Sequence, residues 1–581
     1  MAMGGLYPRV AHGEALAALC VERAALGIPR EGIGKPVNPA GLDVRAGRLR
    51  SRPGGRSSHR GFSEDHGARF NLRRLRQGAE RTKQRKKMTN KHTQDRRTFL
   101  KTLGSAAAAA GTVSLLAGLG LSGCRGADSR KPNLGLSGYR GAGSRKPNIV
   151  FIMADDLGYK DLGYCGGWIQ TPNIDKLAVA GTQLDQFYVQ PVCSPTRSSL
   201  MTGRYPMRYG LQAGVVRPWS QHGLPLEERT LAEAFKEAGY TTAICGKWHL
   251  GHLDHRYLPT ARGFDHQYGH YNGALDYFTH IRDGALDWNR DDKPLREEGY
   301  TTDLIAAESV RLIEQHDFSH PLFLYVPFNA PHGPFQAPQS YLDLYRSIKE
   351  PRKRAYAAMV TCMDDAIEQI VSAIDKRGVG RNTLVFFCSD NGGLDIVSDN
   401  RPLRGQKGLL YEGGVRVPAF AVWPGVLEPG VVARGPLHMV DMYPTLLKLA
   451  GGSLESANGG PLDGKDAWAT ISKGQPSPHD EILLNVTPFN GAIRCGDWKL
   501  IHNSHLEANY TGPIPAEHTF ELFNLADDPY EKNDLSGKNP RKLEELKTRL
   551  KSYADNAAKA NISPSEMPKD FKIPKAWGHR D

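Results

Sequence analysis

Residues 148–156 read NIVFIMADD, and this stretch decides the fold. Its first six positions form an almost continuous apolar run, which is typical of a strand buried on both faces of a sheet. Further strand-like runs are separated by segments with helical periodicity, as in parallel βαβ units. The strand-like runs are 241–245, 322–326 and 383–388, and the helical segments are 231–238 and 364–376. We therefore predict an α/β sandwich with a large, mostly parallel central sheet flanked by helices.

A second part of the chain follows the stretch KGQPSP at 473–478. Four short strand-like runs, which we expect to be antiparallel, lie at 481–485, 492–494, 498–501 and 521–523. One helix face is then marked by Leu543, Leu546, Leu550 and Tyr553. We expect a larger domain over 147–475 and a smaller α+β subdomain with an antiparallel sheet over 476–581, whose last twenty residues wrap over the surface.

The formal charge of +13 comes almost entirely from residues 1–87, which hold 19 Lys or Arg against 7 Asp or Glu. This segment is rich in Arg, Gly and Pro and lacks an apolar period, unlike a folded domain. Met88 then opens a segment in which RRTFLK at 96–101 resembles a twin-arginine export signal, read by the Tat export machinery. We infer that translation starts at Met88 and that residues 1–87 are a non-translated leader. A long basic arm ahead of the signal is the alternative.

The apolar run 106–121 is short for a membrane span and leads into LSGC at 121–124, which resembles a bacterial lipobox. We expect a signal peptide over 88–123 and a lipid on Cys124, which would place the mature protein in the periplasm or at the cell surface. An ordinary signal peptide is the alternative. A duplicated 15-residue segment makes 124–146 a flexible tether. From Cys124 onward, 52 basic and 54 acidic residues leave no positive charge to recruit nucleic acid.

Acidic and amide side chains follow two of the predicted strands. Asp155 and Asp156 come directly after the first strand, and Asp390 and Asn391 follow a later one. Because the carboxyl ends of parallel strands meet at one edge of the sheet, we expect these four side chains to lie close together. Adjacent carboxylates repel each other unless a cation compensates, and a hard divalent ion prefers oxygen ligands. For Asp155 and Asp156 taken alone, a solvated acidic turn is the alternative.

A cysteine motif and three further motifs extend this pattern. Residues 193–197 read CSPTR, followed by SSLMTGRYP, and the later motifs are GKWHLG at 246–251, APHGP at 330–334, and PLRGQKG at 402–408 with EGG at 412–414. In this order they resemble the type I sulfatases of the alkaline-phosphatase-like superfamily, over about residues 146–560. The resemblance implies the fold of that superfamily, a sulfuric ester hydrolase, and oxidation of Cys193 to Cα-formylglycine by a maturase.

The same resemblance implies roles for individual residues. The hydrated aldehyde at position 193 attacks sulfur, Asp390 takes its proton, and His332 protonates the departing oxygen. His249 then takes the proton whose loss expels sulfate. The implied calcium ligands are Asp155, Asp156, residue 193, Asp390 and Asn391. The implied catalytic residues are Cys193, Arg197, Lys247, His249, His332, Asp390 and Lys407.

One stretch departs from the family pattern. Residues 263–272 read GFDHQYGHYN and offer no clear match for the sulfate-contacting Ser or His of some relatives. The continuation to DYF at 276–278 most resembles the arylsulfatase B (N-acetylgalactosamine-4-sulfatase) type, which favours a sulfated sugar, such as a glycosaminoglycan or an algal polysaccharide, as substrate. Two alternatives stay open: a phosphonate monoester or phosphodiester hydrolase of the same superfamily, and a non-catalytic sulfated-glycan binder in which Cys193 is never converted.

Overall fold

The computed structural model describes residues 145–581, except for 456–459, 488, 509, 511–514 and 580–581. The expected leader, export signal and lipid-bearing Cys124, and nearly all of the expected tether, lie outside the described residues. Within the described part, every helix is too short or too polar to span a bilayer.

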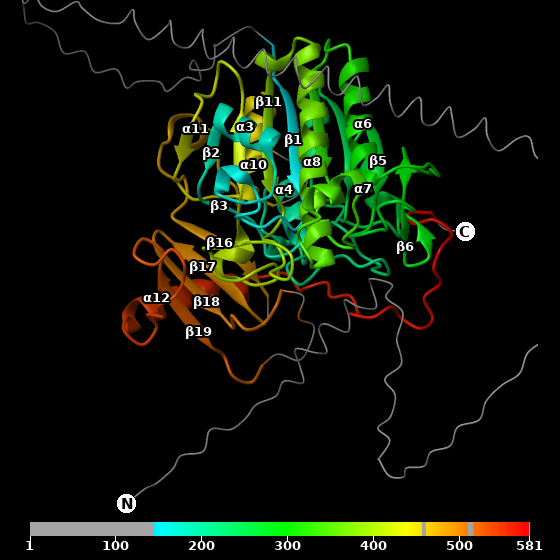
Figure 1. Cartoon of the computed structure of the whole chain (residues 1–581). Coiled ribbons are helices and arrows are strands. Elements are labelled where there is room, and N and C mark those ends of the chain that lie inside the picture. Colours follow the sequence, from blue (N-terminus) through cyan, green and yellow to red (C-terminus); the bar gives the residue numbers. More distant parts are fainter. Residues whose placement is uncertain (1–144, 456–459, 488, 509, 511–514, 580–581) are drawn as a thin grey trace, which may run out of the picture. The chain divides into compact units, whose positions relative to one another are not determined.

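Strand β1 (Asn148–Ala154) is fully buried and lies in the middle of a ten-stranded sheet (Figure 1). Its side chains alternate between two cores: Val150 and Ile152 pack on one face of the sheet, and Ile149 and Phe151 on the other. Burial on both faces is the reason for the apolar run that the sequence shows at this strand.

The sheet is parallel at its centre and mixed at its edges. Every neighbouring pair is parallel, as predicted, from β11 (Thr383–Ser389) through β1, β10 (Leu322–Pro327) and β4 (Thr241–Lys247) to β5 (His266–His270). In contrast, β13 (Ala419–Val422) pairs antiparallel with β11, and β8 (Asn289–Arg290) pairs antiparallel with β5. The full order is β14 (Val431–Ala433), β2 (Thr182–Leu184), β13 (Ala419–Val422), β11 (Thr383–Ser389), β1, β10 (Leu322–Pro327), β4 (Thr241–Lys247), β5 (His266–His270), β8 (Asn289–Arg290) and β9 (Lys293–Pro294).

Helices cover both faces of this sheet. The core on the Val150 side includes residues of α3 (Pro172–Ala180), α6 (Thr301–Gln315) and α8 (Pro351–Lys376). The core on the Ile149 side includes residues of α4 (Cys193–Thr202), α5 (Leu231–Glu237), α10 (Met442–Leu449) and α11 (Trp468–Lys473). Short elements complete this part: β3 (Phe187–Tyr188), β12 (Arg416–Val417), β15 (Leu437–His438), β6 (Ile281–Arg282), β7 (Ala285–Leu286), α7 (Gln339–Leu342) and α9 (Glu412–Val415).

Helix α8 is longer than predicted. The apolar period indicated a start at residue 364, whereas the helix begins at Pro351. Proline is favoured in the first helical turn, and the Glu350 carboxylate accepts hydrogen bonds from the backbone N–H groups of Arg352 and Lys353. The first half of α8 is buried on several sides, which hides the amphipathic period that marks the second half.

A four-stranded antiparallel sheet forms the C-terminal part, as predicted. Its strands lie in sequence order: β16 (Glu481–Val486), β17 (Gly491–Cys495), β18 (Trp498–His502) and β19 (Phe520–Asn524). Helix α12 (Pro540–Asp555) packs on this sheet through the buried side chains of Leu546 and Leu550. The rest of the chain, 556–579, holds no helix or strand and is mostly exposed, but Trp577 within it is fully buried.

Candidate active site

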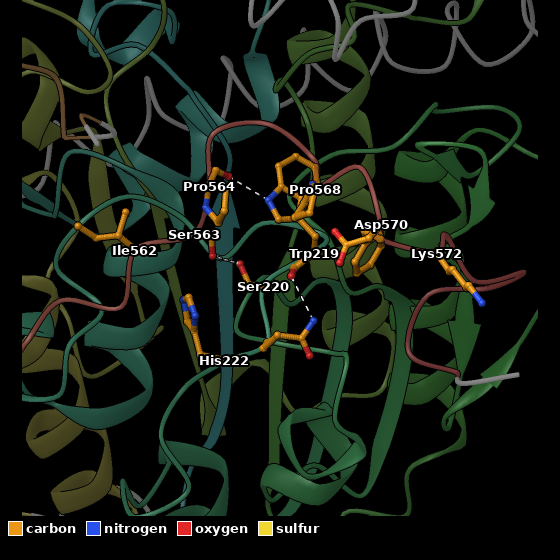
Figure 2. A pocket seen from close by; sticks show the side chains of 11 residues that line it. Trp219, Ser220, His222, Ile562, Ser563, Pro564, Pro568, Asp570 and Lys572 are labelled. Carbon is orange, nitrogen blue, oxygen red and sulfur yellow. Dashed lines mark hydrogen bonds between the residues drawn. The ribbon is translucent and has the colours of Figure 1, made fainter. Parts of the chain in front are cut away.

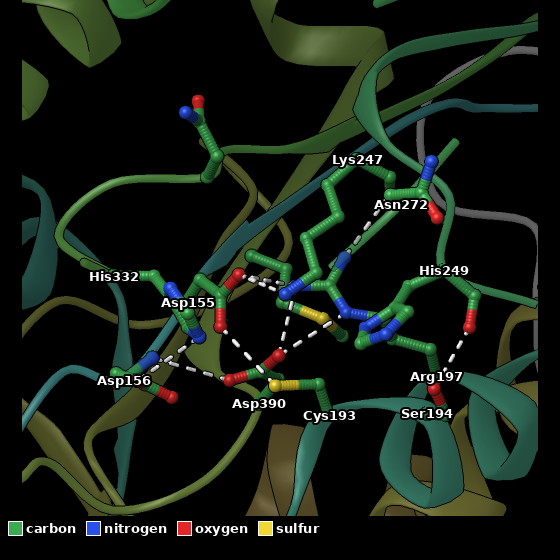
Figure 3. Close-up of polar contacts among 12 residues, drawn as sticks. Asp155, Asp156, Cys193, Ser194, Arg197, Lys247, His249, Asn272, His332 and Asp390 are labelled. Atoms are coloured by element: carbon green, nitrogen blue, oxygen red, sulfur yellow. Dashed lines mark hydrogen bonds and ion pairs between the residues drawn. The ribbon is translucent and has the colours of Figure 1, made fainter. Parts of the chain in front are cut away.

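The carboxyl ends of the parallel strands bring the candidate residues together (Figure 3). Asp155 follows β1, Lys247 ends β4, His332 follows β10, and Asp390 follows β11. These strands are neighbours in the order β11, β1, β10 and β4, so residues more than 230 positions apart in sequence meet at one edge.

Cys193 is the first residue of α4 and is only 1% exposed. Its Sγ lies 3.4 Å from Oδ1 of Asp155. Burial and the charges of Asp155 and Asp390 raise the pKa of the Cys193 thiol well above its usual value. The unmodified side chain is therefore a neutral thiol, which is a weak nucleophile.

Arg197 lies one helical turn after Cys193 and joins two of the strand ends. Its Nε and Nη2 donate to Oδ2 of Asp390 at 3.1 and 2.8 Å. Its Nη1 donates to the carbonyl oxygen of Lys247 at 3.1 Å. The guanidinium is also 3.5 Å from Oδ2 of Asp155. This fork fixes the helix that carries residue 193 against β4 and β11.

The two adjacent aspartates have opposite electrostatic environments. Burial, with the charge of Asp390, raises the pKa of Asp155 to about 7, although Lys247 forms an ion pair with it. Burial also acts on Asp156, but the nearby Lys407 and His332 outweigh it and hold the pKa of that carboxyl below its usual value. Lys407 Nζ is 2.7 Å from Oδ2 of Asp156. Asp156 has a φ of 64°, a left-handed backbone conformation that is uncommon for residues other than glycine.

The cluster has the donors that a hard divalent cation requires. Ligand atoms of Asp155, Asp156, Cys193 and His332 all lie within 4.8 Å of one another. Asn391 donates its amide N–H to Asp156 at 2.8 Å, while its buried Oδ1 has no partner among the described residues. Oxygen donors predominate, and the unpartnered Oδ1 of Asn391 offers a further neutral oxygen ligand, so the residues present fit such an ion.

The two candidate histidines are both neutral in this environment. Burial and the cations Lys247 and Arg197 hold the pKa of His249 well below its usual range. Its Nε2 is 3.0 Å from the carbonyl oxygen of Val216, and its buried Nδ1 has no partner in the described part of the chain. Burial and Lys407 lower the pKa of His332 to about 3. Its Nε2 is 3.6 Å from Oδ2 of Asp156.

Lys407 lies on a loop whose close packing requires glycine. The Lys407 N–H donates to the carbonyl oxygen of Gly393 at 3.2 Å. A Cβ on Gly392 would lie 1.9 Å from the carbonyl oxygen of Gly413, and one on Gly413 would lie 2.3 Å from that of Gly405. Only glycine fits at these contacts, which explains the glycines around the lysine in the sequence motif.

The segment that the sequence left unassigned contributes three side chains near this site. His270 pairs with Lys247 across β4 and β5, and Lys247 and Arg197 contribute to a pKa that burial holds well below the usual histidine value. Both side-chain amide atoms of the buried Asn272 lack partners among the described residues. The Tyr277 hydroxyl hydrogen-bonds to the carbonyl oxygens of Asn329 and His332, at 2.6 and 2.7 Å. Sequence reasoning missed His270 because its position depends on the register between β4 and β5, and it missed Tyr277 because its partners follow β10, more than 50 residues later.

Parallel strands that end in a buried, oxygen-rich cluster, with a small antiparallel sheet after them, define the alkaline-phosphatase-like class of hydrolases. The crystal structure of Ps i-CgsB superposes with a TM-score of 0.66 and 32% identity, covering 72% of this chain and 96% of that one. The same protein has been solved in complex with k-i-k-neocarrahexaose, with a TM-score of 0.65.

The sulfatase family model matches residues 147–453. Mouse arylsulfatase J is 36% identical over 470 residues, which are 72% of this chain and 77% of that protein. The ulvan-active sulfatase of Formosa agariphila is 31% identical over 452 residues, 73% of this chain and 82% of that protein. The protein therefore belongs to the sulfatase family and is a sulfuric ester hydrolase.

Proposed function

We propose that the protein is a formylglycine-dependent sulfatase that removes sulfate esters from a sulfated carbohydrate. The observation that carries this proposal is the position of Cys193, which contacts Asp155 inside a ring of cationic and imidazole side chains. Such a ring suits the anionic sulfate group of a sulfate monoester, and a neutral buried thiol suits a precursor that is chemically modified rather than a thiolate nucleophile.

The chemistry begins with the hydrated aldehyde at position 193. One of its two hydroxyl oxygens attacks sulfur, and the bond between sulfur and the alcohol oxygen of the substrate breaks. Asp390, which Arg197 holds through two hydrogen bonds, is our assignment for the acceptor of the attacking hydroxyl's proton. Lys247 and Lys407 stabilise the negative charge that grows on the sulfuryl oxygens.

His332 is our assignment for the acid that protonates the departing alcohol. Its pKa of about 3 reflects burial beside Lys407, so the free site holds it neutral. An anionic sulfate ester beside the imidazole would raise that pKa, which couples protonation of His332 to substrate binding. His249, whose Nδ1 is unpartnered among the described residues, is our assignment for the base that takes the proton of the second hydroxyl. Sulfate then leaves and the aldehyde re-forms.

We assign the metal as Ca²⁺, held by Asp155, Asp156, Asp390, Asn391 and an oxygen of modified residue 193. A bound calcium ion would offset the carboxylate charge and lower the pKa of a coordinated hydroxyl. Dialysis against a chelator should lower the melting temperature and abolish activity, and Ca²⁺ should restore both. Unchanged melting and activity after verified metal removal would contradict this assignment.

The finer substrate class rests on the relatives and on one stretch of this chain. A neighbour in fold has been solved in complex with k-i-k-neocarrahexaose, and a relative is an ulvan-active sulfatase. The resemblance of Asp276–Phe278 to the arylsulfatase B type adds support for a sulfated sugar. We also propose export with a lipid on Cys124, which loss of lipid labelling in the Cys124→Ser variant would test.

The experiment that tests the function joins mass spectrometry of residue 193 with rate measurements. Protein from a host with a formylglycine-generating maturase should carry formylglycine and hydrolyse an aryl sulfate faster than an aryl phosphodiester. Faster phosphodiester hydrolysis would favour the phosphoester branch of the superfamily. Unmodified Cys193, together with no sulfate release, would leave glycan binding as the better function.

A further inference from the structure

A pocket of about 480 Å³ lies between two segments that are far apart in the sequence (Figure 2). One wall is formed by Trp219–His222, and the other by the C-terminal segment Ile562–Lys572. The lining mixes the aromatic rings of Trp219 and Phe571 with charged and polar side chains. Aromatic surface with a few polar groups is the usual composition of a small-molecule site.

The two walls are tied together by hydrogen bonds. The indole N–H of Trp219 donates to the carbonyl oxygen of Pro564 at 2.9 Å, and the hydroxyls of Ser220 and Ser563 are hydrogen-bonded to each other. Ser220 also accepts from the backbone N–H of Arg217 at 2.7 Å. These contacts fix the position of the Trp219 ring relative to the C-terminal segment.

The C-terminal wall has its own anchor in Trp577, which is fully buried. Its indole N–H donates to the carbonyl oxygen of Arg282 at 2.8 Å. Its ring contacts the rings of Phe571 and His252, with centroids 6.1 and 5.4 Å away. Phe571 lines the pocket, so the anchor and the pocket share a side chain, and the pocket is part of the packed structure.

The pocket adjoins the candidate active site through Val216. The carbonyl oxygen of Val216 is 3.0 Å from Nε2 of His249, and its N–H donates to Oγ of Ser194, the neighbour of Cys193, at 3.0 Å. Trp219 follows three residues later, and three extended residues span at most about 11 Å. A glycan held at residue 193 thus reaches the pocket with a sugar further along its chain.

Arg217, between Val216 and the pocket wall, is a cation without a counter-ion. It is partly buried, and no carboxylate of the described residues forms an ion pair with it. Burial and the charge of Arg282 lower the pKa of its guanidinium. The guanidinium carbon is 5.9 Å from the centroid of the Trp219 ring. A desolvated, unpaired cation is costly, and an anionic ligand would offset that cost.

We propose that this pocket is a second sugar subsite, which binds a sugar of the glycan chain beyond the one that carries the scissile sulfate. Trp219 packs against the sugar ring, and Arg217, which lies beside the Trp219 ring and outside the pocket lining, takes a sulfate or carboxylate group on it. On the opposite wall Lys572 adds a positive charge and Asp570 a negative one, so Arg217 provides the preference for an anionic group. The proposal rests on the proposed function, because it assigns how the same enzyme recognises a polyanionic glycan.

Equilibrium binding to a Cys193→Ala background tests the subsite without turnover. The probes are carrageenan and chondroitin sulfate hexasaccharides, each with its desulfated counterpart. At least one sulfated hexasaccharide should bind, and Arg217→Ala should weaken that binding about tenfold, with partial recovery in Arg217→Lys. The exposed Arg346, which lies outside the pocket, provides a matched control, since Arg346→Ala should leave the affinity unchanged.

Kinetics give the second readout. In the enzyme with Cys193 intact, Arg217→Ala should lower kcat/KM for the hexasaccharide more than for an aryl sulfate, through KM. Trp219→Phe keeps an aromatic ring without the indole N–H, and should separate ring packing from support of the C-terminal wall. Binding that is equal for all Arg217 variants, or absent for every sulfated probe, would overturn the subsite. Arg217-dependent binding without sulfate release would instead contradict the proposed reaction alone.

Discussion

Two buried clusters of charged side chains lie in this molecule, and they differ in what remains unpaired. At the candidate active site, Asn391 Oδ1 and His249 Nδ1 are buried without partners among the described residues. In the C-terminal part, Lys499 forms ion pairs with Glu412 and Glu531 at 2.9 and 2.8 Å, so Glu531 Oε1, which has no hydrogen bond among the described residues, still faces a cation. The other oxygen of Glu412 accepts from the Tyr188 hydroxyl at 2.8 Å. Burial and charge are common to both clusters, so the unpaired ligand atoms are what indicate a binding site.

The two clusters are also connected. Glu412 belongs to α9, five residues after Lys407, and its backbone N–H donates to Oε2 of Glu531 at 2.7 Å. Arg404, on the other side of Lys407, donates to the carbonyl oxygen of Glu531 at 2.9 Å. The C-terminal sheet therefore supports the loop that presents Lys407, and the Lys499 cluster is a structural counterpart to the reactive one.

The largest effect is expected at Cys193. Serine provides only one hydroxyl, so Cys193→Ser should lose multiple turnover by at least about a thousandfold and accumulate sulfated enzyme, visible as an added sulfuryl group in the intact mass. The melting temperature should stay close to that of the parent. Cys495→Ser, at a partly buried cysteine of the C-terminal sheet, is the matched control. Full turnover by Cys193→Ser would rule out the formylglycine chemistry.

Replacing Lys407 of the candidate active site should lower the rate of the reaction more than the stability of the fold. We expect Lys407→Met to lower kcat by about 100- to 1000-fold, since one preorganised charge on the sulfuryl oxygens is lost. Steady-state kinetics on an aryl sulfate, with thermal denaturation alongside, provide the measurement. A loss of stability large enough to account for the lost activity would show that Lys407 supports the fold and does not act on the sulfuryl group.

Replacing Lys499 should have the opposite effect, a larger loss of stability than of activity. Lys499→Met removes the cation that both buried carboxylates share and leaves Glu412 with only Arg416, at 3.6 Å, as an ion-pair partner among the described residues, so the free energy of unfolding should fall by about 3–5 kcal/mol. The kcat of the molecules that remain folded should change only a few-fold. Replacing the whole cluster, in Lys499→Met/Glu412→Gln/Glu531→Gln, should recover much of the stability. Unchanged denaturation curves for Lys499→Met would show that the cluster is not structural.

The smallest effect concerns pH. Burial and the charge of Glu412 outweigh Lys499 and raise the pKa of Glu531 to about 7, above the value of about 4.3 in an unfolded chain. Between these pH values the folded state holds a proton that the unfolded state has released. The contribution of Glu531 to the free energy of unfolding therefore falls as pH rises, and it levels off above about pH 7. Glu531→Gln should remove that slope, by on the order of 1–3 kcal/mol between pH 5 and 8. Urea denaturation at several pH values measures it, and parallel slopes would contradict the shift.

Much of the fold could be predicted from the sequence because its central strands are buried on both faces. The run at 148–153 is apolar for that reason, and the acidic pairs mark where two such strands end. The start of α8 could not be placed, since burial on several sides removes the period. Lys499 and Glu531 resemble surface charges in the sequence, and only the packing of the C-terminal sheet buries them together.

The site was predictable where each residue lies in a local motif and unpredictable where it depends on pairing. Lys247 and His249 share one short motif, but His270 enters the site only because its strand lies beside β4 in a particular register. The pocket at Trp219 joins segments about 340 residues apart, through contacts that no local pattern encodes.

The burial of Cys193 has a consequence for the timing of its modification during synthesis. The side chain is 1% exposed in the folded protein, where Asp390, which follows β11, is among its neighbouring charges. Asp390 leaves the ribosome 197 residues after Cys193. At about 5–20 residues per second, this interval lasts roughly 10–40 s. A maturase that oxidises Cys193 has at least this interval on the nascent chain before the site can close, so slower translation between these positions should raise the converted fraction.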